Sequence, residues 1–501
     1  METHPIPTTK TVTTKQSVSS YVSTTNACKL CKPMGACLAF RGVEGAIPFL
    51  HGSQGCATYM RRYIISHFRE PMDIASSSLG EKHAVYGGEA NLKQGLVNVM
   101  KKYGAGLVGI ATTCLTETIG DDVPMILKAF RQEWASREGS SDLPFLVNVS
   151  TPSYAGTHME GFHAAVRAMA DQLARRDEAH DGVNLFPGFV SPADLRYLKE
   201  IMADFGLRTI LLPDYSDTLD GPALEDYEKI PRGGTSVRDL VSMGGSRATI
   251  ELGRTLSPRR WAGTQPGPTL TARDGNSSGA QAGPTVMVRE IDTAGTLLEA
   301  RFGVPLHGIG LPIGLRESDR FFEILQDLAG FCMPEKHALE RGRLLDAFVD
   351  GHKVVFGKRA VVYGEEDLVV GLTAFLCEIG VKPVLCASGG VGNGFREAIE
   401  AVTRDILPDP PEVREGVDFY EIAEEARELA PDLLVGHSKG YHLARRWNIP
   451  LIRVGFPIHD RFGGQRTLHL GYRGALALLD RLINELLERK QEDSPVGYGY
   501  L

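Results

Sequence analysis

Cysteine thiols are the side chains of this 501-residue sequence best suited to chemistry, and they are unevenly distributed. Five of the eight cysteines precede residue 115, among loops rich in glycine, proline and serine. Three of these five, Cys31, Cys56 and Cys114, occupy tight turns or strand ends, in CKPMGA, HGSQGC and TTCLTE. Thiolates are the soft ligands that iron–sulfur clusters require. The pattern therefore predicts cluster ligands, with ordinary buried thiols as an equally weighted alternative.

The spacing of Cys28 and Cys31 suggests two other kinds of site, and neither fits the surrounding sequence. A C-x2-C pair is typical of zinc ribbons and of redox-active dithiols. A zinc ribbon needs a second such pair or two histidines at similar spacing, and neither follows here. A thioredoxin-like pair follows a strand, whereas this pair precedes KPMG, before any convincing strand.

Strand and helix signals alternate along most of the chain, which is typical of parallel α/β units. In residues 358–388, an apolar run is followed by a Gly-Glu-Glu turn, an amphipathic helix and a second apolar run. The same order recurs in residues 182–215, where Ser191 is a predicted helix N-cap. In residues 104–130 it places Cys114 just after a buried strand, at the edge where open α/β sheets bind ligands.

These units predict an α/β fold of three doubly wound, Rossmann-like domains with parallel sheets. The predicted segments are an N-terminal flexible arm (1–26), three domains (27–185, 186–335 and 336–490) and a C-terminal tail (491–501). Residues 257–285 are rich in Gly, Pro, Ser and Thr, and we expect them to form an exposed, mobile insertion.

The overall composition excludes several classes of function. A formal net charge of −8 argues against general nucleic-acid binding. No run of about 18 apolar residues is present, so we expect no membrane span. Residues 1–26 also lack the apolar centre of a secretory signal. We therefore expect a cytoplasmic protein whose cysteines stay reduced, where metal binding or burial is favoured over disulfides.

Longer stretches of the sequence resemble the β-type chains of nitrogenase component 1. The resemblance runs in order from about residue 26 to residue 490 and is broken mainly by residues 257–285. It rests on these motifs: NACKLCKPMGA, FLHGSQGCATYMRRYIISHFREP, YGGEANLKQGL, TTCLTETIGDDV, STPSYAGTHMEGF, PEKHALERGRLLDA, IRVGFPIHDR and LGYRGALALLDRLINELLER. The family includes dinitrogenase β subunits, the NifN-type chain of the cofactor-assembly scaffold, and the nitrogenase-like methylthio-alkane reductase.

The resemblance implies a cofactor and two partners. It implies an α-type subunit in an α2β2 complex, and a transient, homodimeric, ATP-hydrolysing iron protein that donates electrons. In catalytic members, an [8Fe-7S] P-cluster lies between the α and β chains, with three cysteines from each. Its β-chain ligands match Cys31, Cys56 and Cys114, and the serine that can bind the oxidised cluster matches Ser153. The active-site iron–sulfur cofactor belongs to the α chain, so we expect no complete substrate site here.

The residues of the site also bear on the subclass that the sequence resembles. Scaffold-type β chains commonly keep the HGSQGC cysteine and lack the other two, so Cys31, Cys114 and Ser153 favour a catalytic complex. In contrast, LEARFGVPLHGIGLPIGLRESDRFFEIL and the GYGYL end are closer to NifN-type chains. A scaffold-like body with catalytic ligands resembles methylthio-alkane reductase, which cleaves C–S bonds. The alternatives are a dinitrogenase β subunit and a NifN-type scaffold.

Several neighbours of these ligands carry weaker predictions. Glycines 35, 52 and 55 are expected to supply N–H donors to the cluster. The alternative for Ser153 is a helix N-cap after Pro152. We expect Cys28 to be inert or to lie behind the ligands, and Cys37 to pack in the core. No catalytic or ligand role is assigned to Tyr59, Arg61, Arg62, His67, Arg69, His83, His158 and His437, and buried thiols are expected at Cys332, Cys377 and Cys386.

Overall fold

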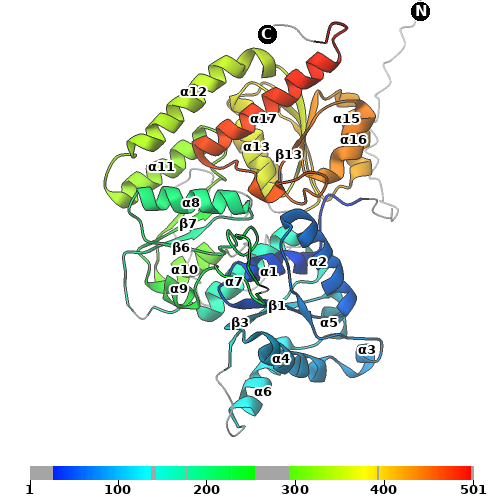
Figure 1. Ribbon diagram of the computed structural model, residues 1–501, viewed down its shortest axis with the longest axis vertical. Helices are drawn as coiled ribbons and strands as arrows, with labels where there is room; N and C mark the ends of the chain where they lie inside the picture. The colour runs from blue at the N-terminus through cyan, green and yellow to red at the C-terminus, as the bar shows by residue number, and fades with distance from the viewer. Residues whose placement is uncertain are drawn as a thin grey trace, which may run out of the picture.

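The structure of the chain, a computed structural model, describes residues 26–136, 143–176, 178–226, 228–253, 255, 293–391 and 394–497. Within these residues the chain forms three sheets, and every pairing between their strands is parallel. Helices cover each sheet (Figure 1). The arrangement confirms the predicted α/β fold. Residues 1–25 of the predicted arm and the predicted insertion at 257–285 lie outside the described residues.

The first sheet has the strand order β2-β1-β3-β4. Its strands are β1 (Ala46–His51), β2 (Ala75–Ser76), β3 (Leu107–Thr112) and β4 (Phe145–Val149). Its helices are α1 (Lys32–Arg41), α2 (Gln54–Phe68), α3 (His83–Tyr86), α4 (Glu89–Tyr103), α5 (Cys114–Ile119), α6 (Val123–Ala135), the 3-10 helix η1 (Ser153–Ala155) and α7 (His158–Leu173). All residues of β1 and β3 are buried, as expected for strands with helices on both faces.

The second sheet has the strand order β6-β5-β7-β8. Its strands are β5 (Val183–Phe186), β6 (Thr209–Leu211), β7 (Ala248–Leu252) and β8 (Leu306–Ile309). Its helices are α8 (Pro192–Asp204), α9 (Val237–Ser242), η2 (Met243–Gly245), α10 (Ala294–Phe302) and α11 (Arg316–Ala329). The N-cap prediction for α8 is confirmed, because the Ser191 hydroxyl accepts a hydrogen bond of 3.0 Å from the backbone N–H of Asp194.

The third sheet has the strand order β11-β10-β9-β12-β13. Its strands are β9 (Arg359–Gly364), β10 (Lys382–Ser388), β11 (Glu412–Arg414), β12 (Leu433–Gly436) and β13 (Leu451–Arg453). Its helices are α12 (Glu335–Val355), α13 (Glu366–Glu378), α14 (Phe395–Thr403), α15 (Phe419–Leu429), η3 (Ser438–Gly440), α16 (Tyr441–Trp447), η4 (Gly464–Arg466) and α17 (Gly471–Glu492). The unit predicted within residues 358–388 is β9, α13 and β10. No helix among the described residues combines the length and apolar character that a membrane crossing requires.

One predicted domain boundary, between residues 185 and 186, falls inside strand β5. Val183 pairs with Thr209 of β6 and with Ala248 of β7, so the whole strand belongs to the second sheet. The change from the first sheet to the second therefore occurs between the end of α7 at Leu173 and the start of β5. The polar segment ARRDEAHDG, residues 174–182, separates the two elements in the sequence and marks the change of sheet.

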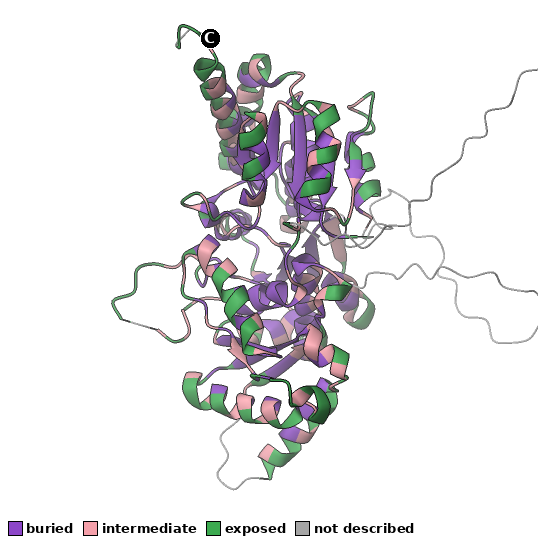
Figure 2. Ribbon diagram, turned by 90° about the vertical axis from the view of Figure 1, so that its right-hand side faces the viewer, coloured by how far each residue is buried: buried purple, intermediate pink, exposed green. Residues whose placement is uncertain are grey.

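The interior of the molecule is continuous across the three sheets. Figure 2 shows buried strands at the centre of each sheet and exposed faces on the outer helices. Helices α1 and α7 lie side by side near the middle of the molecule (Figure 1). Asp194 joins the second sheet to the segment before α17, because its Oδ1 accepts hydrogen bonds from His469 N (2.9 Å) and Leu470 N (3.0 Å). The sheets thus form a shared core that fixes their relative positions.

A buried carboxyl group in the third domain predicts a pH-dependent stability. Burial raises the pKa of Glu366 to about 8, the charge of Glu160 adds to this effect, and a hydrogen bond from Ser388 Oγ (2.8 Å) opposes it. Since this pKa lies above its unfolded value, the stabilisation is fully present below about pH 4.5 and is lost as the pH rises through about 8.

We expect Glu366→Gln to remove this part of the pH dependence, because glutamine keeps the shape and has no proton to lose. The wild-type melting temperature should fall more steeply than that of the variant between pH 5 and pH 9. At the alkaline end, the difference in unfolding free energy should be on the order of 3 kcal/mol. Glu397→Gln, at an exposed position, is the control. Equal slopes for Glu366→Gln and the wild type would contradict the prediction.

Candidate metal centre

Three of the four predicted ligands follow adjacent strands of the first sheet. Cys56 lies in the first turn of α2 after β1, Cys114 begins α5 after β3, and Ser153 begins η1 after β4. β3 pairs in parallel with both β1 and β4, so the three strands end at one edge of the sheet. The prediction that Cys114 follows a buried strand is confirmed. The same topology brings the other two positions to the same edge.

The fourth residue, Cys31, reaches this edge through a close contact between helices. It is the N-cap residue of α1 and forms an antiparallel bridge with Thr157, the N-cap of α7. The two helices approach so closely that a Cβ on Gly35 would lie 1.7 Å from the carbonyl oxygen of His158. A Cβ on Gly161 would likewise lie 1.8 Å from a carbonyl oxygen of α1. Glycine at both positions therefore permits the contact that places Cys31 beside η1.

The structure brings the four side chains together on one face. The Ser153 hydroxyl lowers the pKa of the Cys31 thiol, and the nearby thiols of Cys114 and Cys56 raise it. The backbone N–H of Ser153 donates to Cys114 Sγ at 3.2 Å. The Ser53 hydroxyl donates to Cys56 Sγ at 3.4 Å. Residues that are up to 122 positions apart in the sequence thus belong to one network.

The ionisation of Cys31 is set by opposing influences. Burial raises the pKa of its thiol, and the nearby thiols Cys114 and Cys56 raise it further. The Ser153 hydroxyl and the ammonium group of Lys439 act in the opposite direction. Without a bound metal, the Cys31 thiol therefore loses its proton less readily than an ordinary cysteine. Iron bound to the sulfur would supply the missing positive charge, as metal coordination deprotonates a thiol.

The residues present fit an iron–sulfur cluster better than a single metal ion. Among the described residues, no three His, Cys, Asp or Glu side chains are close enough to hold one ion. Cys31, Cys56 and Cys114 interact electrostatically without converging on one point, as ligands of different irons would. All three are half-buried, and nearby Tyr59 and Tyr154 are 45% and 69% exposed. The thiols therefore lie at an open face that a partner chain can cover.

Helix ends add positive potential around two of the thiols. Cys31 precedes the first turn of α1, and Cys56 is the third residue of the 15-residue α2. The unpaired N–H groups of a first helical turn carry a partial positive charge, which favours thiolates and anionic groups. Neither α1 nor α2 has an acidic residue in its first turn to offset this effect. The local field thus favours a negatively charged cluster.

The glycines near the ligands have different roles from those predicted. Gly35 lies inside α1 and serves the contact with α7, so the prediction that it donates to a cluster is wrong. The N–H of Gly52 is already bonded to Ser77 Oγ at 2.9 Å, so that prediction is wrong as well. Gly55 is exposed in the first turn of α2, and its role as a donor stays a prediction.

The alternative interpretation of Ser153 is also wrong. Ser153 is the first residue of η1, and the N-cap position belongs to Pro152. The hydroxyl that caps the following helix α7 is that of Thr157, which accepts from Met159 N at 3.2 Å. The Ser153 hydroxyl is instead close enough to Cys31 to lower the pKa of its thiol.

The other cysteines separate into buried and exposed thiols. Cys28 packs among apolar residues of the third domain, with its Sγ 4.0 Å from His437 Nε2. Burial raises its pKa far above the ordinary value, so it is a neutral thiol, which supports the inert role. Cys37 is fully buried in α1, as predicted. Cys377 and Cys386 are also buried, but Cys332 is exposed because α11 ends at Ala329 and a loop follows.

One face of α2, the helix that contains Cys56, packs against the rest of the protein. His67 Nδ1 accepts from Ile458 N at 2.8 Å, and Arg61 Nε donates to the carbonyl oxygen of Met72 at 2.8 Å. Arg69 reaches the carbonyl oxygen of His459. Tyr59 and Arg62 are exposed on the same helix. Both side chains are available to a partner.

The other three histidines assigned no ligand role lie in structural positions. His158 Nε2 is 3.1 Å from Glu365 Oε1, and both side chains are buried between the first and third domains. Burial lowers the pKa of His437 to about 3, so its ring is neutral. His83 Nδ1 accepts a hydrogen bond of 2.9 Å from Gly80 N at the exposed start of α3.

Lys439 is a contributor that sequence reasoning missed. It lies in η3 of the third domain, and its Nζ donates to the carbonyl oxygen of Ala27 at 2.8 Å. Its charge also acts on Cys31. More than 400 residues separate the two positions in the chain, and no local sequence pattern relates them. Only the packing of the third domain on the first brings this charge to the site.

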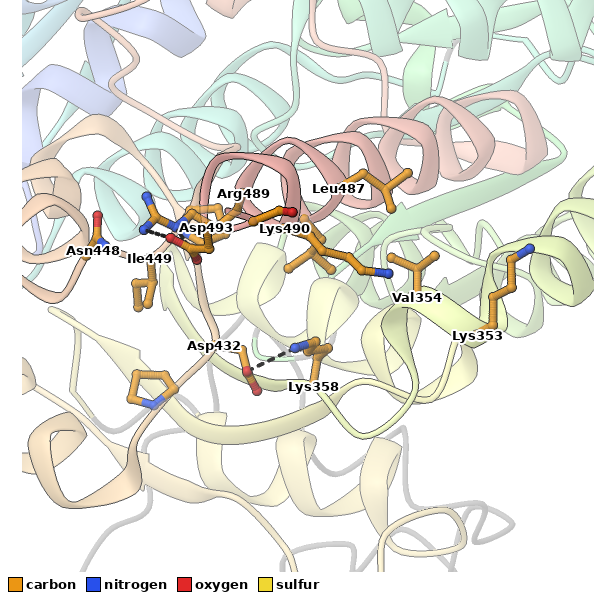
Figure 3. Close-up of a pocket in the computed structure, with 14 residues that line it drawn as sticks. Lys353, Val354, Lys358, Asp432, Asn448, Ile449, Leu487, Arg489, Lys490 and Asp493 are labelled. Atoms are coloured by element: carbon orange, nitrogen blue, oxygen red, sulfur yellow. Dashed lines mark hydrogen bonds and ion pairs between the residues drawn. The ribbon is translucent and has the colours of Figure 1, made fainter. Parts of the chain in front are cut away.

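A separate pocket of about 680 Å³ lies at the third sheet, beside the amino ends of its strands (Figure 3). Lys358 and Asp432, which form an ion pair of 3.2 Å, immediately precede strands β9 and β12. Arg489 and Asp493 of the C-terminal segment pair on its other side. The pocket therefore lies at the amino ends of the strands, whereas open α/β sheets bind ligands at the carboxyl ends. It contains none of the predicted ligands.

Comparison with known proteins agrees with this geometry. The family described as nitrogenase component 1 type oxidoreductase matches residues 31–265 and 263–487. A nitrogenase molybdenum-iron protein β chain of Clostridium pasteurianum is 31% identical over 482 residues, covering 96% of this chain and 97% of the relative. A molybdenum-iron β chain of Methanothermobacter thermautotrophicus is 34% identical, with coverages of 92% and 94%. A vanadium-iron β chain of Trichormus variabilis is 32% identical, with coverages of 91% and 92%.

A solved structure extends the similarity to three dimensions. A chain of nitrogenase Cp1 at pH 6.5 is 30% identical and superposes with a TM-score of 0.86, covering 97% of this chain and 98% of that chain. The similarity thus spans all three sheets of the chain. The chain belongs to the nitrogenase component 1 family of oxidoreductases and is of the β-chain type.

Proposed function

We propose that this chain is the electron-relay subunit of a nitrogenase-like catalytic complex. In this proposal, Cys31, Cys56, Cys114 and Ser153 hold half of an [8Fe-7S] P-cluster, and an α-type subunit holds the other half. The observation that carries the proposal is the meeting of these four side chains on a half-buried face. When bound, such a cluster accepts and releases electrons one at a time.

The residues of this chain bind and shield that group. Cys31, Cys56 and Cys114 supply thiolate ligands from three separate elements, which makes the site rigid. The Ser153 N–H donates to Cys114 Sγ, and such hydrogen bonds to sulfur tune a redox potential. The Ser153 hydroxyl is a hard oxygen donor, suited to a more oxidised iron. Its effect on the pKa of Cys31 places it beside the thiol ligands.

The open side of the centre is where we place the α-type subunit, in an α2β2 complex. Tyr59 and Tyr154 are exposed beside the half-buried thiols, and exposed aromatic side chains are enriched at protein interfaces. The names of the relatives support this placement, since each is a β chain.

The active-site iron–sulfur cofactor is assigned to the α-type subunit. A homodimeric, ATP-hydrolysing iron protein is the proposed electron donor. We place the complex in the cytoplasm, where cysteines stay reduced.

The substrate that we propose is a methylthio-alkane, whose C–S bond the complex cleaves reductively. The scaffold-like sequence of the body together with the complete ligand set supports this subclass. Dinitrogen reduction is the second candidate, because the relatives compared above are molybdenum-iron and vanadium-iron β chains. A scaffold for cofactor assembly is disfavoured, because Cys31, Cys114 and Ser153 accompany Cys56 in one network.

The test is an activity assay of the complex purified anaerobically with its own α-type subunit, iron protein and ATP. Methanethiol from dimethyl sulfide is the expected product. Ammonia from dinitrogen without methanethiol would replace the methylthio-alkane proposal with the dinitrogenase one. The absence of both products, together with transfer of an iron–sulfur cluster to an apo-acceptor, would identify a scaffold.

A further inference from the structure

His51 is a buried histidine that none of the roles above accounts for. It ends strand β1, five residues before Cys56, and its side chain is fully buried. Its Nδ1 lies 2.9 Å from Ser77 Oγ, and its Nε2 lies 3.0 Å from Asp121 Oδ2. Both ring nitrogens of a buried histidine are thus engaged, and each engages a different segment of the chain.

The carbonyl group of His51 binds the turn that carries Cys114. It accepts a hydrogen bond from Thr113 N at 3.1 Å, and it lies 3.2 Å from Thr113 Oγ1 and 3.0 Å from Thr116 Oγ1. Thr113 is the N-cap of α5 and immediately precedes Cys114. The main chain of His51 therefore holds the start of the helix on which Cys114 lies.

The imidazole of His51 holds the turn that leads to Cys56. The hydroxyl of Ser77 accepts a hydrogen bond from Gly52 N at 2.9 Å. The His51 ring therefore holds the Ser77 hydroxyl in place, and this hydroxyl in turn holds the backbone of Gly52. The two turns touch here, because a Cβ on Gly52 would lie 2.1 Å from Thr113 Oγ1. No side chain fits between them.

The carboxylate of Asp121 completes the connection at the far end of α5. It follows the C-cap Gly120 and accepts from Gly88 N at 3.1 Å. A carboxylate only accepts hydrogen bonds, so the ring proton of His51 is on Nε2, and Nδ1 accepts from the Ser77 hydroxyl. Burial lowers the pKa of His51 although Asp121 opposes this effect, which agrees with a neutral ring. One histidine thus contacts both ends of α5 and the turn before α2.

We infer that His51 is a positioning residue that sets the separation between the Cys56 and Cys114 thiols through its bonds to Ser77, Asp121 and Thr113. The inference deepens the proposed function and rests on it, because the separation matters only if the two thiols bind one cluster. Residues that orient metal ligands affect metal affinity or activity by about 10–100-fold when they are changed.

The test uses His51→Gln in the anaerobically purified complex with the α-type subunit. The glutamine amide reaches the place of Nε2 and can donate to Asp121, but it leaves Ser77 without its partner. We expect interface iron to be retained, the EPR spectrum of the oxidised interface cluster to change, and product formation to fall about tenfold. In His51→Asn, the shorter side chain places its amide at Nδ1, where it can bond to Ser77. We expect the spectrum of this variant to lie closer to that of the wild type than the spectrum of His51→Gln does. Asp121→Asn keeps the size of the carboxylate group and gives the same readout if His51→Gln does not assemble.

His337→Gln is the matched control. His337 is also fully buried and lies 2.9 Å from a carboxylate, that of Asp204, but it belongs to α12 in the third domain. We expect it to lower the melting temperature without changing the EPR spectrum. Unchanged spectra and rates in both His51→Gln and Asp121→Asn would overturn the inference and leave His51 as a core residue. A wild-type complex without interface iron would instead overturn the proposed function, so the two failures are distinguishable.

Discussion

Replacing Cys56, Cys114 or Cys31 with alanine is expected to remove or degrade the interface cluster in the complex with the α-type subunit. Each substitution deletes one sulfur from a network that supplies no spare thiol, because Cys28 is buried in the third domain and Cys37 inside α1. Iron content should fall below the wild-type value. Product formation that depends on the iron protein should fall by at least about 100-fold, more than for residues that only orient a ligand. Iron analysis and an activity assay measure both effects.

Two other cysteines serve as matched controls for this series. Cys332→Ala removes an exposed thiol, and Cys37→Ala removes a buried thiol of the same helix that Cys31 caps. Both variants should keep the wild-type iron content, although Cys37→Ala should lose some stability through the small cavity it leaves. Loss of activity in Cys56→Ala with full retention of iron would contradict the assignment of Cys56 as a ligand.

The second large effect is expected from Gly35→Ala, in the contact between α1 and α7. The new methyl group would lie 1.7 Å from the carbonyl oxygen of His158, a backbone atom that cannot turn away. The helices must separate, and Cys31 at the end of α1 must move away from Ser153. Overpacking commonly costs 1–3 kcal/mol, and a backbone obstacle places this change at about 3 kcal/mol or more. A melting curve and an iron analysis of the purified complex should both show losses.

Gly342→Ala is the matched control for this prediction. Gly342 lies within α12, and a Cβ there would meet no atom within 4 Å. Alanine in a helix is favoured over glycine by up to about 1 kcal/mol, so the control should melt at or slightly above the wild-type temperature. If Gly35→Ala melts like Gly342→Ala and keeps its iron, the close contact is not what places Cys31.

Much of the fold was predictable from the sequence because buried parallel strands are continuous apolar runs. The runs at β3, β9 and β10 are separated from their helices by polar or glycine turns, and these elements appear where expected. The two-residue strand β2 carries no such signal. The predicted boundary falls inside β5 instead of in the polar segment 174–182 that precedes this strand. Contacts between domains, such as that of Lys439 with Ala27, depend on packing that no local pattern encodes.

The candidate site was predictable in its residues and less so in its construction. The types and turns of Cys31, Cys56 and Cys114 suggested iron–sulfur chemistry, and the family resemblance added Ser153. A glycine next to a ligand, however, has the same appearance in sequence whether it donates to a cluster or permits a helix contact. Gly35 permits the contact between α1 and α7. Cys332 lies in an apolar run, yet the end of α11 leaves it exposed, because burial depends on where the helix stops.

We propose that half of an eight-iron, electron-relaying cluster is held by Cys31, Cys56, Cys114 and Ser153. The most direct measurement is iron quantification combined with EPR spectroscopy during oxidative titration of the anaerobically purified complex with the α-type subunit. We expect eight interfacial irons per pair of chains and an oxidised state reached in more than one electron step. A four-iron interface cluster, or a colourless complex without iron, would contradict the proposal.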